Sequence, residues 1–160
     1  MQSNIRVISL LGLCFALAAS VSAASREKSA DAAAVEKVLA GIVAADNAAD
    51  LDAVVSHYTE DAILLPPNDV PVVGKLAIRA RYEEAFRHFR FDIAFVSDES
   101  QLFGDWAFVR GVIRGRTIPK DETSGRTLND KFVMILHREK DGWKIARLIW
   151  NGSDPVQQHS

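Results

Sequence analysis

The chain has 160 residues, and its 19 Lys and Arg against 21 Asp and Glu give a formal net charge of −2. This length suits one domain with a substantial core. The mildly acidic balance argues against the basic face that nucleic-acid binding requires, so we expect no nucleic-acid partner.

Residues 1–23 have the three-part pattern of a secretory signal. The positive charge of Arg6 precedes the apolar run VISLLGLCFALAA, and small residues follow up to Ala23. We expect cleavage after Ala23, a periplasmic or secreted protein, and no membrane association once the segment is removed. A retained N-terminal anchor is the alternative, although the run is short for a bilayer span. Cleavage would remove Cys14, the only cysteine, and leave no internal disulfide.

Three stretches then show the apolar spacing of amphipathic helices. Either Ser29 or Asp31 is expected to cap the first helix. The second helix opens at the N-cap residue Asp50, and the third follows Gly74. The positions expected to face the core are Val35, Val38, Leu39, Ile42 and Val43 in the first helix, Leu51, Val54, Val55 and Tyr58 in the second, and Ile78, Tyr82, Ala85, Phe86 and Phe89 in the third.

The rest of the chain is typical of strands. A short apolar run at 62–65 stops at two prolines, and the period of apolar residues becomes two from Phe91 onward. Strands are expected at 91–98, 106–117, 128–139 and 143–151, with a polar hairpin loop at 119–126. Helices followed by strands indicate the α+β class, with the helices against one face of the sheet.

We therefore expect three N-terminal helices packed on a strongly curled mixed or antiparallel sheet, which together form a cone. The open end of such a cone is a concave apolar space, the usual form of a small-molecule site. The folded domain is expected at 31–152, between a flexible segment at 24–30 and a flexible tail at 153–160.

Four motifs resemble the nuclear transport factor two-like superfamily. They are DLDAVVSHYTEDA at 50–62, VVGKLAIR at 72–79, GDWAFVRG at 104–111 and DGWKIARLIWN at 141–151. The chain is most similar to the SnoaL-like and ketosteroid-isomerase-like branch, within the SgcJ/EcaC-like group. The resemblance implies a cystatin-like α+β roll and a homodimer formed through the outer face of the sheet. It does not choose a function, because members include isomerases, cyclases, dehydratases and dimerisation modules.

The resemblance also implies a test for isomerase chemistry. Ketosteroid isomerases use a carboxylate base after the first strand, with a tyrosine and a protonated acid as the oxyanion hole. Here the base position falls on Pro66 and the tyrosine position on Ile42, and only the second acid is matched, near Asp130. The constellation is incomplete. The remaining weak candidates for moving a proton are Asp130, Tyr58 and Asp46.

Other chemistries find little support in the sequence. Glu60 and Asp61 are interpreted as exposed residues at a helix end, so Asp61 is discounted as a base. No glycine fingerprint for a dinucleotide is present. We expect no metal and no cofactor, because the histidines lie on separate elements, at His57, His88, His137 and His159.

The leading hypothesis is a domain that binds a small, largely apolar ligand, with catalysis undetermined. The expected ligand contacts are Tyr58, Leu64, Pro67, Tyr82, Phe86, Phe95, Arg110, Leu148, Trp150 and Asn151. The placement of Arg110 stays open. If Ala107 and Ile113 form the inner row of their strand, Arg110 faces outward with a dimer surface. If not, it is a cavity cation suited to a carboxylate or enolate.

Two alternatives remain. One is a cofactor-independent isomerase, cyclase or dehydratase that works by general acid–base catalysis. The other is a homodimeric interaction module whose cavity is filled by its own side chains, Phe86, Phe89 and Phe95. Convergent polar groups in an open cavity would favour the enzyme, and a dry open cavity would favour ligand binding.

Overall fold

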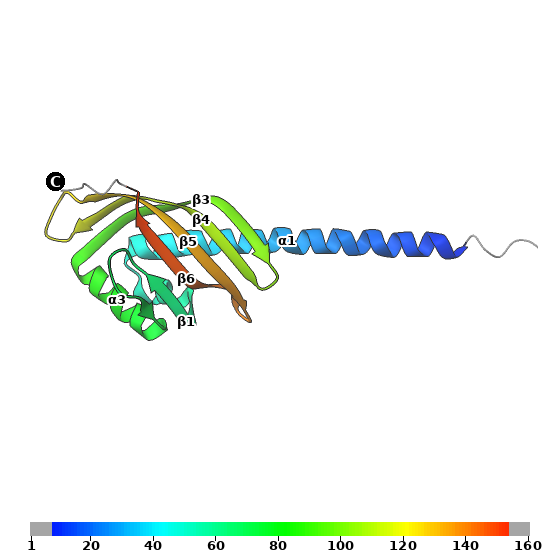
Figure 1. Cartoon of the computed structure of the whole chain (residues 1–160), viewed down its shortest axis with the longest axis horizontal. Helices are drawn as coiled ribbons and strands as arrows, with labels where there is room; N and C mark the ends of the chain where they lie inside the picture. Colours follow the sequence, from blue (N-terminus) through cyan, green and yellow to red (C-terminus); the bar gives the residue numbers. More distant parts are fainter. Residues whose placement is uncertain (1–7, 154–160) are drawn as a thin grey trace, which may run out of the picture.

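The computed structural model describes residues 8–153, with side chains from Arg26 onward. It is an α+β fold of three helices and six strands (Figure 1), as predicted. In chain order the elements are α1 (Ile8–Ala48), α2 (Leu51–Ser56), β1 (Tyr58–Leu65), β2 (Val72–Val73), α3 (Lys75–His88), β3 (Phe89–Phe103), β4 (Trp106–Pro119), β5 (Arg126–Glu139) and β6 (Gly142–Gly152).

The six strands form one open, mixed sheet in the order β2-β1-β6-β5-β4-β3. Neighbouring strands are antiparallel except β1 and β6, which are parallel. The sheet does not close on itself, so the strong curl that we expected is an overstatement. The helices lie on one face of the sheet, and α3 lies at one end of it (Figure 1).

The core lies between α1 and the inner face of the sheet. Val35, Leu39 and Ile42 of α1 are buried, as their helical spacing predicted. Strand residues with a period of two meet them, including Val109 and Met134. Full burial of one such aliphatic side chain stabilises the fold by roughly 1.5–3 kcal/mol, so this layer provides much of the driving force for folding.

The start of helix α1 differs from the prediction, whereas the start of helix α2 agrees with it. Helix α1 begins at Ile8 rather than near Ser29, because the residues before Ser29 include neither Pro nor Gly for several turns and so do not break it. Residues 1–7 of the expected signal segment lie outside the described residues, and export through residues 1–23 stays a prediction. Helix α2 begins after the predicted N-cap, Asp50, whose side chain accepts a hydrogen bond from the amide of Ala53 at 3.0 Å.

Helix α2 ends at Ser56, so Tyr58 opens strand β1 instead of closing the helix. Its backbone is in register with Ile145 of β6, and sheet pairing overrides the helical spacing of the local sequence. Among the residues that the structure describes, no helix combines the length and apolar character needed to cross a membrane.

Asp31 anchors α1 to strands β5 and β6, near the turn that joins them. Its carboxylate pairs with Arg138 and accepts a hydrogen bond from the Trp143 indole at 3.4 Å. The Arg138 guanidinium also lies 4.9 Å from the centre of the Trp143 ring, a cation–π distance. Asp31 therefore has a tertiary role in place of the predicted helix cap.

Asn47 holds the C-terminal end of α1 against the edge strand β3. Its side-chain amide donates to the Ile93 carbonyl at 2.9 Å, and its carbonyl oxygen accepts from the Ile93 amide at 2.9 Å. The side chain thus imitates a neighbouring strand and satisfies one residue of an otherwise open edge. The same bonds fix the helix turn that carries Asp46.

We expect Asn47→Ala to lower the free energy of unfolding by about 1–2 kcal/mol, because two hydrogen bonds to the Ile93 backbone are lost. Urea denaturation followed by circular dichroism measures this change. Asn129→Ala, at an exposed position on β5, is the matched control and should change stability by less than about 0.5 kcal/mol. Equal stabilities for the two variants would contradict the role assigned to Asn47.

Candidate functional site

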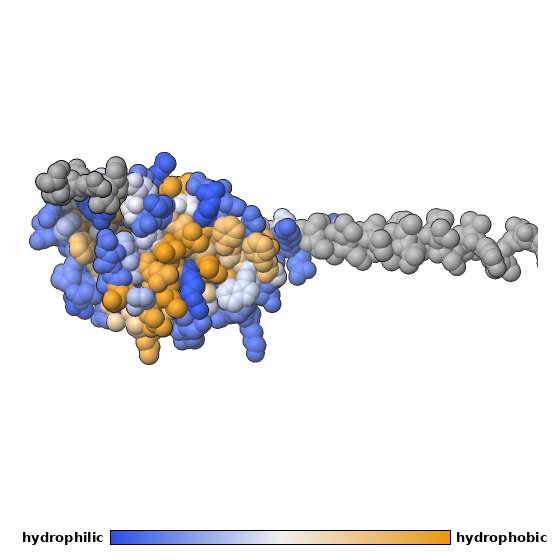
Figure 2. Space-filling model, viewed as in Figure 1, coloured by the Kyte–Doolittle hydropathy of each residue, from blue (hydrophilic) through white to orange (hydrophobic). Residues whose placement is uncertain are grey.

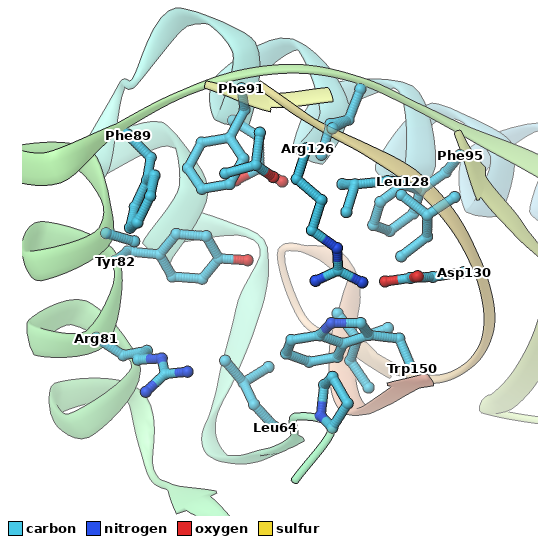
Figure 3. Close-up of a pocket in the computed structure, with 17 residues that line it drawn as sticks. Leu64, Arg81, Tyr82, Phe89, Phe91, Phe95, Arg126, Leu128, Asp130 and Trp150 are labelled. Atoms are coloured by element: carbon cyan, nitrogen blue, oxygen red, sulfur yellow. The ribbon is translucent and has the colours of Figure 1, made fainter. Parts of the chain in front are cut away.

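A cavity of about 300 Å³ lies between the helices and the inner face of the sheet. Most of its wall is apolar, and Figure 3 shows aromatic and aliphatic side chains from several elements around it. The lining residues are Asp46, Leu64, Pro67, Arg81, Tyr82, Ala85, Phe89, Phe91, Ile93, Phe95, Ile113, Thr117, Arg126, Leu128, Asp130, Leu148 and Trp150. The cavity is open, so the interaction module with a phenylalanine-filled interior has no support.

Exposure distinguishes the floor of the cavity from its mouth. Leu64, Ile113 and Leu148 are buried and form the interior. Phe89 and Arg126 are exposed and mark the opening. The period of two along β5 places Arg126, Leu128 and Asp130 on the same side of that strand. The strand therefore runs from a cationic mouth to an acidic interior.

Asp46 is a buried, ionisable group of the cavity interior. It lies in the last turn of α1, is 5% exposed, and lines the cavity. Its Oδ1 atom is buried without a hydrogen-bond partner among the described residues. Burial raises the pKa of the Asp46 carboxyl to about 8, because an apolar surrounding disfavours the charged form. At neutral pH the group is therefore mainly a neutral acid.

Two tyrosines form a hydroxyl pair beside Asp46. The hydroxyl oxygens of Tyr58 and Tyr82 lie 3.0 Å apart. Tyr58 is fully buried, whereas Tyr82 lines the cavity and points its hydroxyl toward the centre (Figure 3). Burial first, and then the charge of Asp46, raises the pKa of both tyrosines. Both stay protonated and can donate hydrogen bonds.

Asp130 supplies a second carboxyl to the cavity wall. It lies on β5, is 5% exposed, and faces the cavity. Figure 3 shows the Arg126 guanidinium reaching toward Asp130 and Trp150. No nitrogen–oxygen distance within 4 Å joins Arg126 to a carboxylate of the described residues. The wall of the cavity therefore contains two carboxyl groups, the hydroxyl-bearing residues Tyr82 and Thr117, and two arginines.

This arrangement suits acid–base chemistry on a bound organic molecule. A buried carboxyl whose pKa lies near the working pH can both give and take a proton at small cost. A hydroxyl donor nearby can stabilise an oxyanion. In the described part of the chain, no group of three or more His, Cys, Asp and Glu side chains lies together as metal ligands would.

Comparison with known proteins identifies the family. Residues 39–148 match the family model of the SnoaL-like domain. The chain belongs to the SnoaL-like family. No curated protein matches the chain.

Solved structures place the SnoaL-like domain among nuclear transport factor two-like folds. A ketosteroid isomerase-like protein from Erwinia carotovora atroseptica is 30% identical, covering 77% of this chain and 96% of that chain with a TM-score of 0.69. A putative aromatic ring hydroxylase from Novosphingobium aromaticivorans is 25% identical, with coverages of 78% and 90% and a TM-score of 0.70. An NTF2-like protein of unknown function from Pseudomonas putida is 16% identical, with coverages of 82% and 92% and a TM-score of 0.65, and shows the fold alone.

Many residues singled out from the sequence lie in the wall of the cavity of the SnoaL-like domain. Both interior carboxyls, Asp46 and Asp130, are among the predicted proton carriers. The predicted ligand contacts that line the cavity are Leu64, Pro67, Tyr82, Phe95, Leu148 and Trp150. Two more lie behind the wall: Tyr58 bonds to Tyr82, and the buried Phe86 ring packs 5.6 Å from the Tyr82 ring.

Two predicted contacts do not line the cavity. Arg110 is on the outer face, where it pairs with Glu99 at 2.6 Å and Asp98 at 3.7 Å. The buried residues of its strand, such as Val109 and Gly111, face inward, so the alternating side chains, Arg110 included, face outward. Asn151 is exposed because it follows Trp150 on β6, and consecutive strand residues point to opposite faces.

Sequence reasoning also missed part of the wall. Arg126 was assigned to a hairpin loop, but it is the first residue of β5. Its spacing from Asp130, four residues, was the signal that both share a face. The other lining residues that were not among the expected ligand contacts are Arg81, Ala85, Phe89, Phe91, Ile93, Ile113, Thr117 and Leu128.

Asp61 is exposed, as expected, but it lies on β1 rather than at a helix end. A hydrogen bond from the Thr59 hydroxyl, at 2.9 Å, and a weaker contribution from Arg147 lower the pKa of Asp61. An exposed carboxylate whose pKa is lowered is a weak base, so the structure agrees with discounting Asp61 as a catalytic base.

The buried Asp46 should make the stability of the SnoaL-like domain depend on pH. The unfolded chain releases this proton near the ordinary value of 3.8, whereas the folded chain retains it until about 8. Between these values the free energy of unfolding falls as pH rises, by up to about 5 kcal/mol from this group. We expect Asp46→Asn to match the wild type at pH 4 and to exceed it by several kcal/mol at pH 8.

Urea denaturation at several pH values measures this difference. Asp121→Asn, in the exposed hairpin loop, is the matched control and should follow the wild type throughout. An Asp46→Asn variant whose stability parallels the wild type from pH 4 to 8 would show that the carboxyl titrates normally.

Proposed function

We propose that the SnoaL-like domain is a cofactor-independent acid–base enzyme that acts on a small, largely apolar organic molecule. The observation that carries the proposal is the Asp46 carboxyl, which is buried in the wall of an apolar cavity with an unpartnered oxygen. An isolated carboxyl is costly to bury without a partner, and sites of catalysis are where such groups accumulate.

Asp46 and Tyr82 divide the chemistry between them. An ionised Asp46 takes a proton from carbon beside a carbonyl group, and the resulting acid returns a proton to the same or a neighbouring atom. Tyr82 donates a hydrogen bond to the developing enolate oxygen, with Tyr58 holding its hydroxyl at 3.0 Å. Isomerase, cyclase and dehydratase reactions share this type of proton transfer.

Ligand binding without chemistry is the second candidate. It is favoured by Pro66 and Ile42, which occupy the positions expected of the isomerase base and tyrosine, and by the mainly apolar wall. In that case the Asp46 carboxyl would only bind a polar atom of the ligand.

Exchange of carbon-bound protons for deuterium distinguishes the two candidates. With 2-tetralone, a two-ring ketone, in D₂O, we expect the wild type to accelerate exchange beside the carbonyl, measured by NMR. Asp46→Asn should lower the rate by at least about 10²-fold, because the base is removed. The wild-type rate should rise with pH and level off above about 8, as Asp46 becomes ionised.

The control is Asp121→Asn, which should exchange at the wild-type rate. Tyr82→Phe should lose roughly tenfold or more of the rate, because one oxyanion donor is removed. If the wild type binds 2-tetralone without accelerating exchange, ligand binding without chemistry becomes the better account.

We also propose that two copies pair through the outer face of the sheet. Trp106, Val133, Ile135 and Ile149 are between 37% and 46% exposed. Val133 is in register with Ile149, and Ile135 with Phe108, so these residues are neighbours across β4, β5 and β6. Hydrophobic residues gather over the middle of the face on which the sheet is seen (Figure 2). Large exposed apolar patches are typical of interfaces.

Light scattering coupled to gel filtration tests the pairing. We expect the wild type to elute as a dimer and Ile135→Glu as a monomer, because a buried unpaired carboxylate at the centre of the interface would be costly. Val70→Glu, at an exposed position outside the patch, should remain dimeric. A monomeric wild type at micromolar concentration would contradict the proposal.

A further inference from the structure

The charges of the cavity are separated by depth. Asp46 and Asp130 are 5% exposed and lie in its interior, whereas Arg81 and Arg126 are exposed residues of its wall. A molecule that enters this cavity therefore meets guanidinium groups first and carboxyl groups last. The apolar wall between them belongs mainly to Phe91, Phe95 and other aromatic or aliphatic residues (Figure 3).

The two arginines differ in their partners. Arg81 donates to Asp69 at 2.8 Å, so part of its charge is compensated at the rim. Arg126 extends its guanidinium from the exposed start of β5 into the cavity, toward Asp130 and Trp150 (Figure 3), and none of the described carboxylates lies within ion-pair distance of it. A planar guanidinium presented in this way fits a carboxylate with two parallel hydrogen bonds.

We propose that the ligand of this cavity is a small cyclic carboxylic acid, held by its carboxylate at Arg126. This inference rests on the proposed function and names its substrate class. The carboxylate stays near the mouth, because the largely apolar interior disfavours a charged group. The ring system then extends inward between the aromatic walls and brings its far end to Asp46 and Tyr82.

The size of the cavity limits the ring system. An apolar cavity of roughly 150 Å³ accommodates benzene, and this cavity holds about 300 Å³. Two fused rings with one carboxylate therefore match the available space. A long-chain fatty acid or a four-ring steroid would extend beyond it.

Calorimetric titration with a matched pair of ligands tests the inference. The probes are 2-naphthoate and 2-naphthamide, which have the same ring system and differ in the charge of the head group. At pH 7 we expect the wild type to bind 2-naphthoate roughly tenfold or more tightly than 2-naphthamide, the gain of a charge-assisted hydrogen-bonded pair.

Arg126→Gln should bring the two affinities to within about twofold of each other, with the larger loss of affinity for 2-naphthoate. Arg126→Lys should keep a reduced preference, because its charge remains but the planar fork is lost. Arg114→Gln removes the same charge from an exposed position on the outer face of β4 and is the control, which should retain the wild-type preference.

The outcomes separate this inference from the proposed function. Equal wild-type affinities for the two probes, or a preference that survives Arg126→Gln, would overturn the carboxylate site while 2-tetralone exchange still supports Asp46 chemistry. Failure of the wild type to bind either probe would overturn the inference, and the exchange assay would then decide the proposed function by itself.

Discussion

The attachment of the last turn of α1 to the edge strand β3 fixes the position of Asp46 in the cavity. Asn47 makes two hydrogen bonds to the backbone of Ile93, and this fixes both the height and the rotation of the turn. Adjacent helix residues point in directions about 100° apart. With Asn47 directed at the strand, Asp46 is therefore directed into the cavity, away from water. Asn47 therefore binds the edge strand, and the adjacent Asp46 places a carboxyl group in the cavity interior.

The burial of Asp46 has a cost that the rest of the domain offsets. A neutral carboxyl with an unpartnered oxygen gives up hydration without a full set of hydrogen bonds. The apolar layer between α1 and the sheet, centred on Ile42, Val109 and Met134, supplies the compensating stability. Catalytic sites commonly hold a group in an environment that lowers the stability of the fold, because that environment sets the reactivity of the group.

The sheet has two different faces because strand residues alternate. On β4 the inward row is Ala107, Val109, Gly111 and Ile113, which are all buried. The outward row then consists of bulky and charged residues, among them Trp106 and Arg110. A cavity on one face and an apolar patch on the other are thus two results of a single periodic pattern. A change of register by one residue would exchange them.

The element types, their order, the Asp50 cap and about half of the apolar wall follow from local spacing and turn residues, so they could be predicted from the sequence. Local spacing could not show that Tyr58 belongs to β1, because pairing with β6 depends on residues almost ninety positions away. Nor could it show that Arg126 reaches back toward Asp130, or that Asp46 has no partner for its oxygen. The sequence by itself determined which side chains are apolar, small or charged. Only the tertiary structure decided which carboxyl loses its water, since desolvation is a property of everything packed around a group.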